Sequence, residues 1–392
     1  KSSLINALAN QNISIVSSVA GTTTDPVEKA FELHPIGPVV FMDTAGIDDI
    51  GDLGQARVQK SLSVLEWMDI AIIVCETNAW GDHEERLLQL THQNSTPTIV
   101  VFNKTDLGEV SADLLQSLQK RGYPVVQTSA ANKQGIEKLR DTIIQMVLSQ
   151  TEPDRPLMGD LAHAGDTVIL VTPIDTGAPK GRLILPQVQA IRELLDAGAK
   201  CFVIKEDRIE ETLQELKTPP ALVVTDSQVV LRVVKEVPEP IPVTTFSIQM
   251  AYAKSDLKEM AVGAAAIANL KPGDRVLISE TCSHHPLKDD IGRVKIPNWL
   301  RQKFGDIQID IAVGKDFPTD LSPYKVIIQC GGCIVTRRHM LARLRAAKAQ
   351  GVPMTNYGVA ISLLQGVLDR ALACHPQAKA AYETALKSYE KN

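Results

Sequence analysis

Three cysteines and a histidine in the last third of the chain have the types and the spacing of metal ligands. They form two short motifs, Cys282-x-His284 and Cys330-Gly-Gly-Cys333. Thiolates hold both iron–sulfur clusters and zinc, and histidine often completes a zinc site. From spacing alone, a three-cysteine iron–sulfur site with His284 as a candidate fourth ligand and a Cys₃His zinc site are equally well supported. The two glycines between Cys330 and Cys333 allow the backbone to wrap closely around a metal.

The other cysteines have no such pattern. Cys75, Cys201 and Cys374 have no cysteine neighbour, and two of them lie in apolar runs, so we interpret them as packed thiols. Six cysteines in 392 residues do not form a disulfide scaffold, and a reducing cytoplasm is the expected compartment. His285 and His339 are interpreted as surface residues.

The first residues of the chain are typical of a nucleotide-binding loop. Lys1-Ser2-Ser3 is the end of a G-x-x-x-x-G-K-S motif, and the apolar pattern after it predicts a helix. Lys1 would then contact the β- and γ-phosphates of a bound nucleotide, and Ser2 would bind Mg²⁺. The glycines that would surround the phosphates are not in the sequence, so we expect this chain to be a fragment that lacks the first strand and most of the phosphate loop.

Two further motifs predict the magnesium and γ-phosphate contacts. The segment Gly21-Thr-Thr23-Thr-Asp25 places Thr23 where a switch threonine meets Mg²⁺ and the γ-phosphate. A buried-strand pattern then ends in Asp43-Thr-Ala-Gly46, a D-x-x-G turn. Asp43 would reach Mg²⁺ through water, and the Gly46 amide would contact the γ-phosphate.

Two more motifs predict guanine recognition. In Asn103-Lys104-Thr-Asp106, the Asp106 carboxylate can accept from N1–H and the exocyclic amine of guanine, so it selects guanine over adenine. The backbone amides of Ser129 and Ala130 would contact the guanine O6. Each motif alone is a weak signal, but five in the right order after apolar strands predict a GTPase domain that binds GTP and Mg²⁺.

The pattern of strands and helices predicts an α/β protein, with a P-loop GTPase domain followed by two further αβ domains with mainly parallel sheets. A linker at 151–156 and a proline-rich segment at 237–242 divide the chain. The predicted domains are a GTPase domain at 1–150, an αβ dimerisation domain at 151–240 and a metal-binding αβ domain at 241–392.

The middle domain has no constellation of catalytic residues. Strands are predicted at 166–171, 201–204 and 221–224, and helices at 185–197 and 209–216. The loop at 173–182 is interpreted as a structural connection. A small αβ unit without chemistry of its own is expected to serve association, and a homodimer is the predicted result.

In the third domain, strands are predicted at 275–279 and 326–329, and helices at 257–270 and 335–350. Both cysteine motifs follow the carboxyl ends of the predicted strands, where a doubly wound sheet places its ligand crevice. The start of the following helix favours thiolates and an anionic centre.

The composition limits the classes of partner. Hydrophobic residues make up 44% of the chain and charged residues 22%, and the net charge is −5. An acidic balance gives no electrostatic footprint for nucleic acid. No apolar run approaches the roughly 18 residues of a membrane span. Neither nucleic acid nor a membrane is therefore an expected partner.

The GTPase motifs resemble those of the TrmE–Era-like GTPases, through the GTTTD segment and the DTAG turn that Ile47 follows in place of glutamine. Without glutamine, no side chain at that position orients the attacking water. The resemblance implies slow intrinsic hydrolysis and K⁺ as a charge-stabilising ion. The asparagine that binds K⁺ in these relatives would precede Lys1.

Domain order and cysteine motifs together resemble the maturation GTPases of [FeFe]-hydrogenase, the HydF family. The resemblance implies a [4Fe–4S] cluster on Cys282, Cys330 and Cys333 with an exchangeable fourth iron position. It also implies a scaffold that delivers a di-iron precursor to apo-[FeFe]-hydrogenase, with two radical-SAM maturases as further partners. The chain has Gln329 where the family pattern has histidine before C-x-x-C. The alternative function is a ribosome- or tRNA-linked regulatory GTPase with a structural zinc.

A run of arginines follows the second cysteine motif: Arg337, Arg338, Arg343 and Arg345. One interpretation is a solvated helix face. The other is that Arg337 or Arg338 holds an anionic, cyanide-bearing di-iron precursor by charge-assisted hydrogen bonds.

Overall fold

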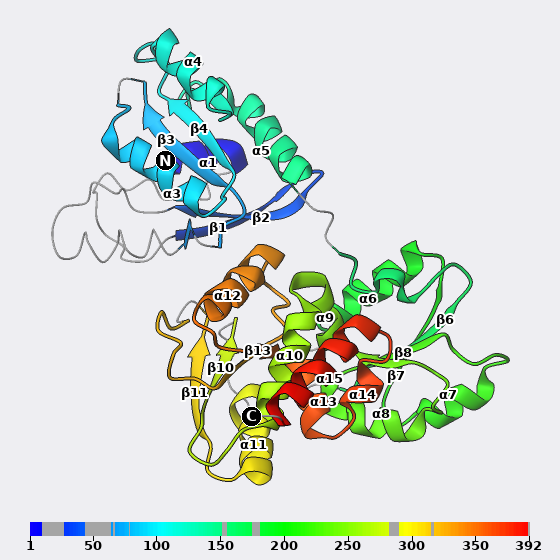
Figure 1. The fold of residues 1–392 in the computed structure, drawn as a ribbon. Coiled ribbons are helices and arrows are strands. Elements are labelled where there is room, and N and C mark those ends of the chain that lie inside the picture. The colour runs from blue at the N-terminus through cyan, green and yellow to red at the C-terminus, as the bar shows by residue number, and fades with distance from the viewer. Residues whose placement is uncertain are drawn as a thin grey trace. The chain divides into compact units, whose positions relative to one another are not determined.

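The computed structural model of the chain describes residues 1–9, 27–43, 64–65, 67–77, 79–150, 155–174, 181–281, 290–314 and 317–390. The chain folds into two compact units, Lys1–Pro153 and Asp154–Asn392 (Figure 1). None of the described helices has the length and apolar character that a membrane crossing requires.

The first unit contains a parallel sheet in the order β3-β4-β5 and an antiparallel hairpin of β1 and β2. The strands are β1 (Val27–Leu33), β2 (Gly37–Asp43), β3 (Ala71–Glu76), β4 (Thr98–Asn103) and β5 (Val125–Thr128). The helices with described bounds are α1 (Ser2–Ala9), α3 (Asp82–Gln93), α4 (Ala112–Lys120) and α5 (Ile136–Gln150). The strand predicted before Asp43 is present as β2, but it is partly exposed instead of buried, with Val40 58% exposed, because among the described strands it pairs only with β1. The helix predicted after the phosphate-loop motif is present as α1.

Helices cover both faces of this parallel sheet. The central strand β4 is buried along its whole length. Its side chains alternate between two clusters, because successive residues of a strand point to opposite faces. Ile99 and Val101 pack with residues of α1 and α5, whereas Val100 and Phe102 pack with residues of α3 and α4. Polar groups can therefore collect only at the ends of the strands, and Asn103 lies at such an end.

The second unit contains two four-stranded parallel sheets of the same strand order, β7-β6-β8-β9 and β11-β10-β12-β13. The first sheet consists of β6 (Thr167–Val171), β7 (Lys200–Ile204), β8 (Leu222–Thr225) and β9 (Val243–Thr245). The second consists of β10 (Arg275–Glu280), β11 (Gln308–Val313), β12 (Val326–Gln329) and β13 (Met354–Asn356). The predicted α/β class with mainly parallel sheets is confirmed.

Helices connect and cover these two sheets (Figure 1). Around the first sheet they are α6 (Leu185–Asp196), α7 (Ile209–Glu215), α8 (Val230–Glu236) and α9 (Phe246–Lys254). Around the second sheet they are α10 (Leu257–Ala268), α11 (Ile296–Phe304), α12 (Arg337–Ala349), α13 (Tyr357–Leu364), α14 (Leu368–Ala371) and α15 (Pro376–Glu390). Short turns of helix occur at Gly159–Leu161, Ser227–Val229 and Ile291–Lys295.

The two halves of the second unit repeat one motif. In each half, the first residue of the edge strand donates a backbone hydrogen bond to the residue that precedes the first strand. These bonds run from Lys200 N to Asp166 O at 2.7 Å and from Gln308 N to Asp274 O at 2.9 Å. In each half, the third strand also donates a backbone hydrogen bond to the residue that precedes the fourth strand. These bonds run from Val223 N to Pro242 O and from Ile327 N to Pro353 O. In both sheets the strand order reverses between the first and third strands. A parallel sheet offers a ligand crevice at such a place.

Helix α10 lies unusually close to the second sheet. A Cβ atom on Gly263 would stand 2.1 Å from the backbone oxygen of Met354 in β13, so only glycine fits there. Small residues surround this glycine in the helix, and the helix is almost wholly buried. This close approach holds β13 against the strand that leads to the second cysteine motif.

The proline-rich segment at 237–242 does not separate two domains as predicted. It connects α8 to β9 within the first sheet of the second unit. Arg370 near the carboxyl end donates hydrogen bonds to the carbonyl oxygens of Pro238 and Ile241, at 2.7 and 2.9 Å. Because β9 belongs to this sheet and α9 packs against it, the middle part of the chain extends to about Lys254.

Candidate nucleotide and metal sites

Two of the predicted magnesium ligands lie together in the first unit. Ser2 begins α1 and Asp43 ends β2, and Ser2 Oγ donates a hydrogen bond to Asp43 Oδ2 at 2.9 Å. Lys1 precedes α1, and its carbonyl oxygen accepts from the backbone amides of Leu4 and Ile5 in the first turn of that helix. Ser3 is an exposed residue of the same helix. The predicted residues Thr23 and Gly46 lie outside the described residues.

The two guanine-recognition motifs are held to each other by hydrogen bonds. Asn103 is buried, and its Oδ1 accepts from Thr128 Oγ1 at 3.0 Å and from Ala130 N at 3.1 Å. Ser129 Oγ donates to Asp106 Oδ1. Both motifs follow neighbouring parallel strands, β4 and β5, so they meet at the same edge of the sheet. The predicted guanine-binding residues are therefore adjacent in space.

Two further features shape this edge. Lys104 has a positive φ of 66° and forms an ion pair with Glu76 at the end of β3. Gly135 also has a positive φ, and a Cβ atom there would stand 2.1 Å from Gln127 O. A glycine is thus required where the loop after β5 turns back into α5. The sequence motifs did not indicate this position.

The second cysteine motif lies against the end of β10. Cys330 directly follows β12, which pairs with β10. Its sulfur accepts a hydrogen bond from Thr281 N at 3.2 Å and lies 3.0 Å from Thr281 Oγ1. Thr281 is the residue before Cys282. Cys282 and His284 themselves lie outside the described residues, but the backbone that leads to Cys282 contacts the Cys330 sulfur.

A lysine from α9 holds the loop that carries Cys330 and Cys333. Lys254 Nζ donates to the carbonyl oxygens of Gly332, Cys333 and Val335 at 3.2, 2.9 and 2.9 Å. Gly332 adopts a positive φ of 63°. The pKa of the Cys333 thiol is raised, first by burial and then by the neighbouring Cys330, while Lys254 acts in the opposite direction. Both Cys330 and Cys333 are half-buried in this loop.

The arginine run after this loop is not a uniform solvated face. Arg345 is exposed, but Arg343 is buried. Arg337 Nη1 donates to Ser255 O at 3.1 Å and to Ala253 O at 3.4 Å, so it binds the end of α9. Arg338 lies half-buried in the first turn of α12. The expectation of a solvated face is therefore wrong for Arg343, whose side chain points into the protein at a helix position that sequence spacing did not distinguish.

The cysteines interpreted as packed thiols have inert environments. Burial raises the pKa of Cys75 to about 12, and those of Cys201 and Cys374 to about 11. Thiols with such pKa values remain protonated at neutral pH, and they are poor metal ligands. Among the described residues, which exclude Cys282 and His284, no group of three or more His, Cys, Asp or Glu side chains is arranged to hold a metal.

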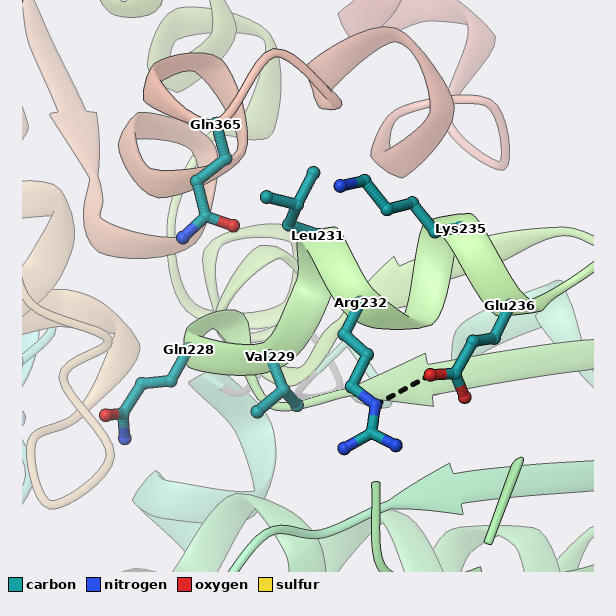
Figure 2. A pocket seen from close by; sticks show the side chains of 7 residues that line it. All are labelled: Gln228, Val229, Leu231, Arg232, Lys235, Glu236 and Gln365. Carbon is teal, nitrogen blue, oxygen red and sulfur yellow. Dashed lines mark hydrogen bonds and ion pairs between the residues drawn. The ribbon is translucent and has the colours of Figure 1, made fainter. Parts of the chain in front are cut away.

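A pocket of about 410 Å³ lies elsewhere in the second unit, alongside α8 (Figure 2). Arg232 and Glu236 form an ion pair at its wall, with Nε to Oε1 at 2.7 Å. The pocket is lined by Gln228, Val229, Leu231, Arg232, Lys235, Glu236 and Gln365. None of the predicted nucleotide or metal residues lines it, so it is separate from both candidate sites.

Sequence reasoning missed Lys254 and Thr281. Thr281 carried a weak signal, because it stands next to a candidate ligand at the end of a predicted strand. Lys254 carried none, because the carbonyl groups that it binds are 78 or more residues away in the chain.

The fold and the two sites define a class of protein: a GTPase domain followed by a second unit that presents a cysteine loop at a sheet crevice. Three family sequence models match the chain. The 50S ribosome-binding GTPase model matches residues 1–104, the hydrogen maturase F dimerization domain matches 157–255, and the hydrogen maturase F tetramerization domain matches 258–374. The chain belongs to the hydrogen maturase F (HydF) family, and its first unit is a GTPase domain.

Individual relatives match the GTPase part. The tRNA modification GTPase MnmE of Finegoldia magna is 38% identical over 149 residues, which are 37% of this chain and 31% of that protein. GTPase Der of Campylobacter hominis is 32% identical over 162 residues, which are 39% and 35% of the two chains. The chain thus spans about a third of the length of these curated relatives. A crystal structure of Aquifex aeolicus Era bound to GDP·AlF₄⁻ aligns with a TM-score of 0.34 at 21% identity, over 54% of this chain and 93% of Era.

Proposed function

We propose that this HydF-family GTPase binds a [4Fe–4S] cluster through Cys282, Cys330 and Cys333 and delivers a di-iron precursor to apo-[FeFe]-hydrogenase. The observation that carries the proposal is the contact of Thr281 with the Cys330 sulfur. Since Thr281 precedes Cys282, the residue before the first cysteine motif contacts the first sulfur of the second motif. His284 is a candidate for an exchangeable fourth position.

The described residues suit such a cluster. Soft thiolates are the ligands that iron–sulfur clusters require, and donors to sulfur stabilise the anionic centre. The backbone amide of Thr281 donates to the Cys330 sulfur, and Thr281 Oγ1 lies 3.0 Å from it. The ammonium group of Lys254 places a positive charge 2.9 Å from the carbonyl oxygen of Cys333. A bound cluster would supply an exchangeable iron position for the precursor, while these residues would hold the loop in shape.

GTP binding is proposed to use the motifs of the first unit. Lys1 would contact the β- and γ-phosphates, and Ser2, Thr23 and Asp43 would hold Mg²⁺. Gly46 would contact the γ-phosphate, and Asp106 would select guanine. Slow hydrolysis is expected because Ile47 cannot orient a water, and K⁺ would stabilise the transition state.

Precursor binding is proposed to use the start of α12. Arg337 and Arg338 both lie in the first turn of the helix that follows Cys333. Arg337 also donates to α9, which would hold its guanidinium in place. Two radical-SAM maturases are the further proposed partners, and a reducing cytoplasm is the proposed compartment. A ribosome- or tRNA-linked GTPase with structural zinc remains the alternative.

Association is proposed to use the first sheet of the second unit, in the middle domain. β7 is an edge strand, and Phe202 and Val203 on it are 41% and 43% exposed. The neighbouring helix α6 also exposes Leu185, Val188 and Leu195. An exposed apolar edge strand tends to pair with another chain. A homodimer joined through β7 would cover these residues.

The function is tested by activation of apo-hydrogenase. The full-length protein, produced together with the two maturases, should confer hydrogen evolution on apo-[FeFe]-hydrogenase. Replacing Arg337 and Arg338 by alanine should spare cluster content and reduce this activation. Arg345→Ala is the matched control, since that side chain is exposed in the same helix. If the wild-type protein confers no activity, the delivery role is wrong.

A further inference from the structure

Gln329 is the last residue of β12 and precedes Cys330. Its side chain is fully buried. The amide Nε2 lies 3.6 Å from the Cys330 sulfur, in hydrogen-bonding geometry with the nitrogen as donor. A buried side-chain amide next to a thiolate can take two orientations. In one, its NH₂ group donates to the sulfur; in the other, its oxygen faces the sulfur. Which of the two occurs depends on what holds the amide.

Arg343 fixes the orientation of this amide. Its Nη1 donates to Gln329 Oε1 at 3.2 Å. A guanidinium group has only donors, so it can face only the oxygen of the amide. The NH₂ group of Gln329 must then point away from Arg343, toward the Cys330 sulfur.

The guanidinium group of Arg343 is itself held on several sides. Nη1 also donates to Ser279 Oγ at 2.9 Å, Nη2 donates to Gly314 O, and the group lies 5.0 Å from the centre of the Phe317 ring. In the part of the chain that the structure describes, all these partners are neutral. A buried cation is stabilised by a nearby anion, and a thiolate at Cys330 would supply one through Gln329.

The Cys330 sulfur thus receives donors from two directions. Thr281 contributes from the end of β10, and Gln329 contributes from the end of β12. Hydrogen bonds to the sulfurs of an iron–sulfur cluster raise its reduction potential, because they stabilise the state with more negative charge.

We propose that Gln329 and Arg343 are positioning residues that direct an amide donor onto Cys330 and raise the reduction potential of the metal centre. The inference rests on the proposed cluster site. The reaction concerned is one-electron reduction of the bound cluster by an added reductant such as dithionite.

The test uses Gln329→Met and Gln329→Glu in the full-length protein, reconstituted anaerobically with iron and sulfide. Methionine removes the donor without adding charge. Glutamate keeps an oxygen for Arg343 but replaces the NH₂ group by oxygen. The midpoint potential is measured by redox titration with EPR detection, alongside iron content and the melting temperature of the metal-free protein. Gln350→Met, which alters an amide that bonds Leu321 N and Thr319 O, is the control.

Both Gln329 variants should have a lower potential than the wild type. The expected shift is about tenfold in the equilibrium constant for reduction, or about 59 mV for one electron. Gln329→Glu should shift further than Gln329→Met, because it adds a negative charge. Loss of the cluster from a variant with an unchanged melting temperature would also support a ligand-positioning role.

Two results would overturn the inference. One is a variant with wild-type iron content and an unchanged potential. The other is cluster loss together with a large fall in the melting temperature of the metal-free protein, because Gln329 would then be purely structural. A wild-type protein that binds no iron and sulfide would instead contradict the proposed cluster site itself.

Discussion

At the scale of single residues, the proposed guanine site depends on one carboxylate. Asp106 Oδ1 accepts from Ser129 Oγ, which holds the carboxylate beside the loop that would contact guanine O6. A carboxylate can accept both guanine donors, whereas an amide presents a donor of its own to one of them. Base selection would therefore follow from the charge and the lone pairs of this one side chain.

We predict that Asp106→Asn weakens GTP binding and admits xanthosine triphosphate. A hydrogen bond to a charged group contributes about 1.5–3 kcal/mol, so GTP affinity should fall roughly 10- to 100-fold. Fluorescent analogues of GTP and xanthosine triphosphate measure both affinities. Asp113→Asn, at an exposed carboxylate in the first turn of α4, should leave them unchanged. Undiminished preference for GTP in Asp106→Asn would contradict the assignment.

At the scale of elements, α9 connects the middle sheet to the cysteine loop. Lys254 at its end binds three carbonyl oxygens of that loop, and Arg337 from α12 binds two carbonyl oxygens at the end of α9. These bonds cross between the two halves of the second unit. The shape of the loop therefore depends on a helix that carries no metal ligand.

Lys254→Met should loosen the loop at residues 330–336. Loss of charged donors to three carbonyl groups should cost about 3 kcal/mol of local stability. Hydrogen exchange of this segment in the metal-free protein should accelerate, and a chelator should remove iron faster from the loaded protein. Lys258→Met, at an exposed lysine of α10, is the control. Equal exchange rates in the two variants would exclude a role for Lys254 in holding the loop.

His375, between α14 and α15, should make stability depend on pH. Burial lowers its pKa from 6.5 to about 4, and its Nε2 lies 2.9 Å from Gln249 Nε2. Between pH 6.5 and 4 the unfolded chain binds a proton here that the folded chain does not, so this stability is present above pH 6.5 and is lost as pH falls. The full effect is about 3 kcal/mol.

His375→Gln should therefore reduce the fall in melting temperature between pH 7 and pH 4.5. His163→Gln, at a side chain that is 75% exposed, should leave it as in the wild type. If the melting temperatures of His375→Gln and the wild type fall by the same amount, the buried imidazole does not contribute to the pH dependence of stability.

The sequence predicted elements better than it predicted their tertiary roles. Apolar runs between turn residues gave β6, β8, β10 and β12 to within one or two residues, because local periodicity decides them. Its main error was at 237–242, where prolines suggest a linker although Arg370 ties the segment into a sheet. The burial of Arg343 and the reach of Lys254 could not be predicted, since both depend on residues distant in the chain.

At the scale of the whole molecule, we propose different roles for the repeated halves of the second unit. Both sheets offer a crevice between their first and third strands, but only the second half has cysteines there. The first half instead exposes an apolar edge at β7. In this proposal, one architecture would serve association in one copy and metal binding in the other.

Phe202→Lys should disrupt self-association. A lysine on an edge strand blocks pairing with another chain because its charge would be buried without a partner. Light scattering after size exclusion should show a smaller assembly than the wild type, with unchanged cluster content. Lys200→Arg, on the same strand, keeps the charge and is the control. A monomeric wild-type protein at micromolar concentration would contradict the proposed dimer.

The central claim is that Cys282, Cys330 and Cys333 together hold an iron–sulfur cluster. The most direct measurement is the iron, sulfide and zinc content of the full-length protein after anaerobic reconstitution, with EPR of the reduced sample. The wild type and Cys374→Ser should each hold about four irons and four sulfides per chain, and serine at any of the three ligands should abolish the stable centre. Stoichiometric zinc without sulfide, or a cluster that survives all three substitutions, would contradict the account.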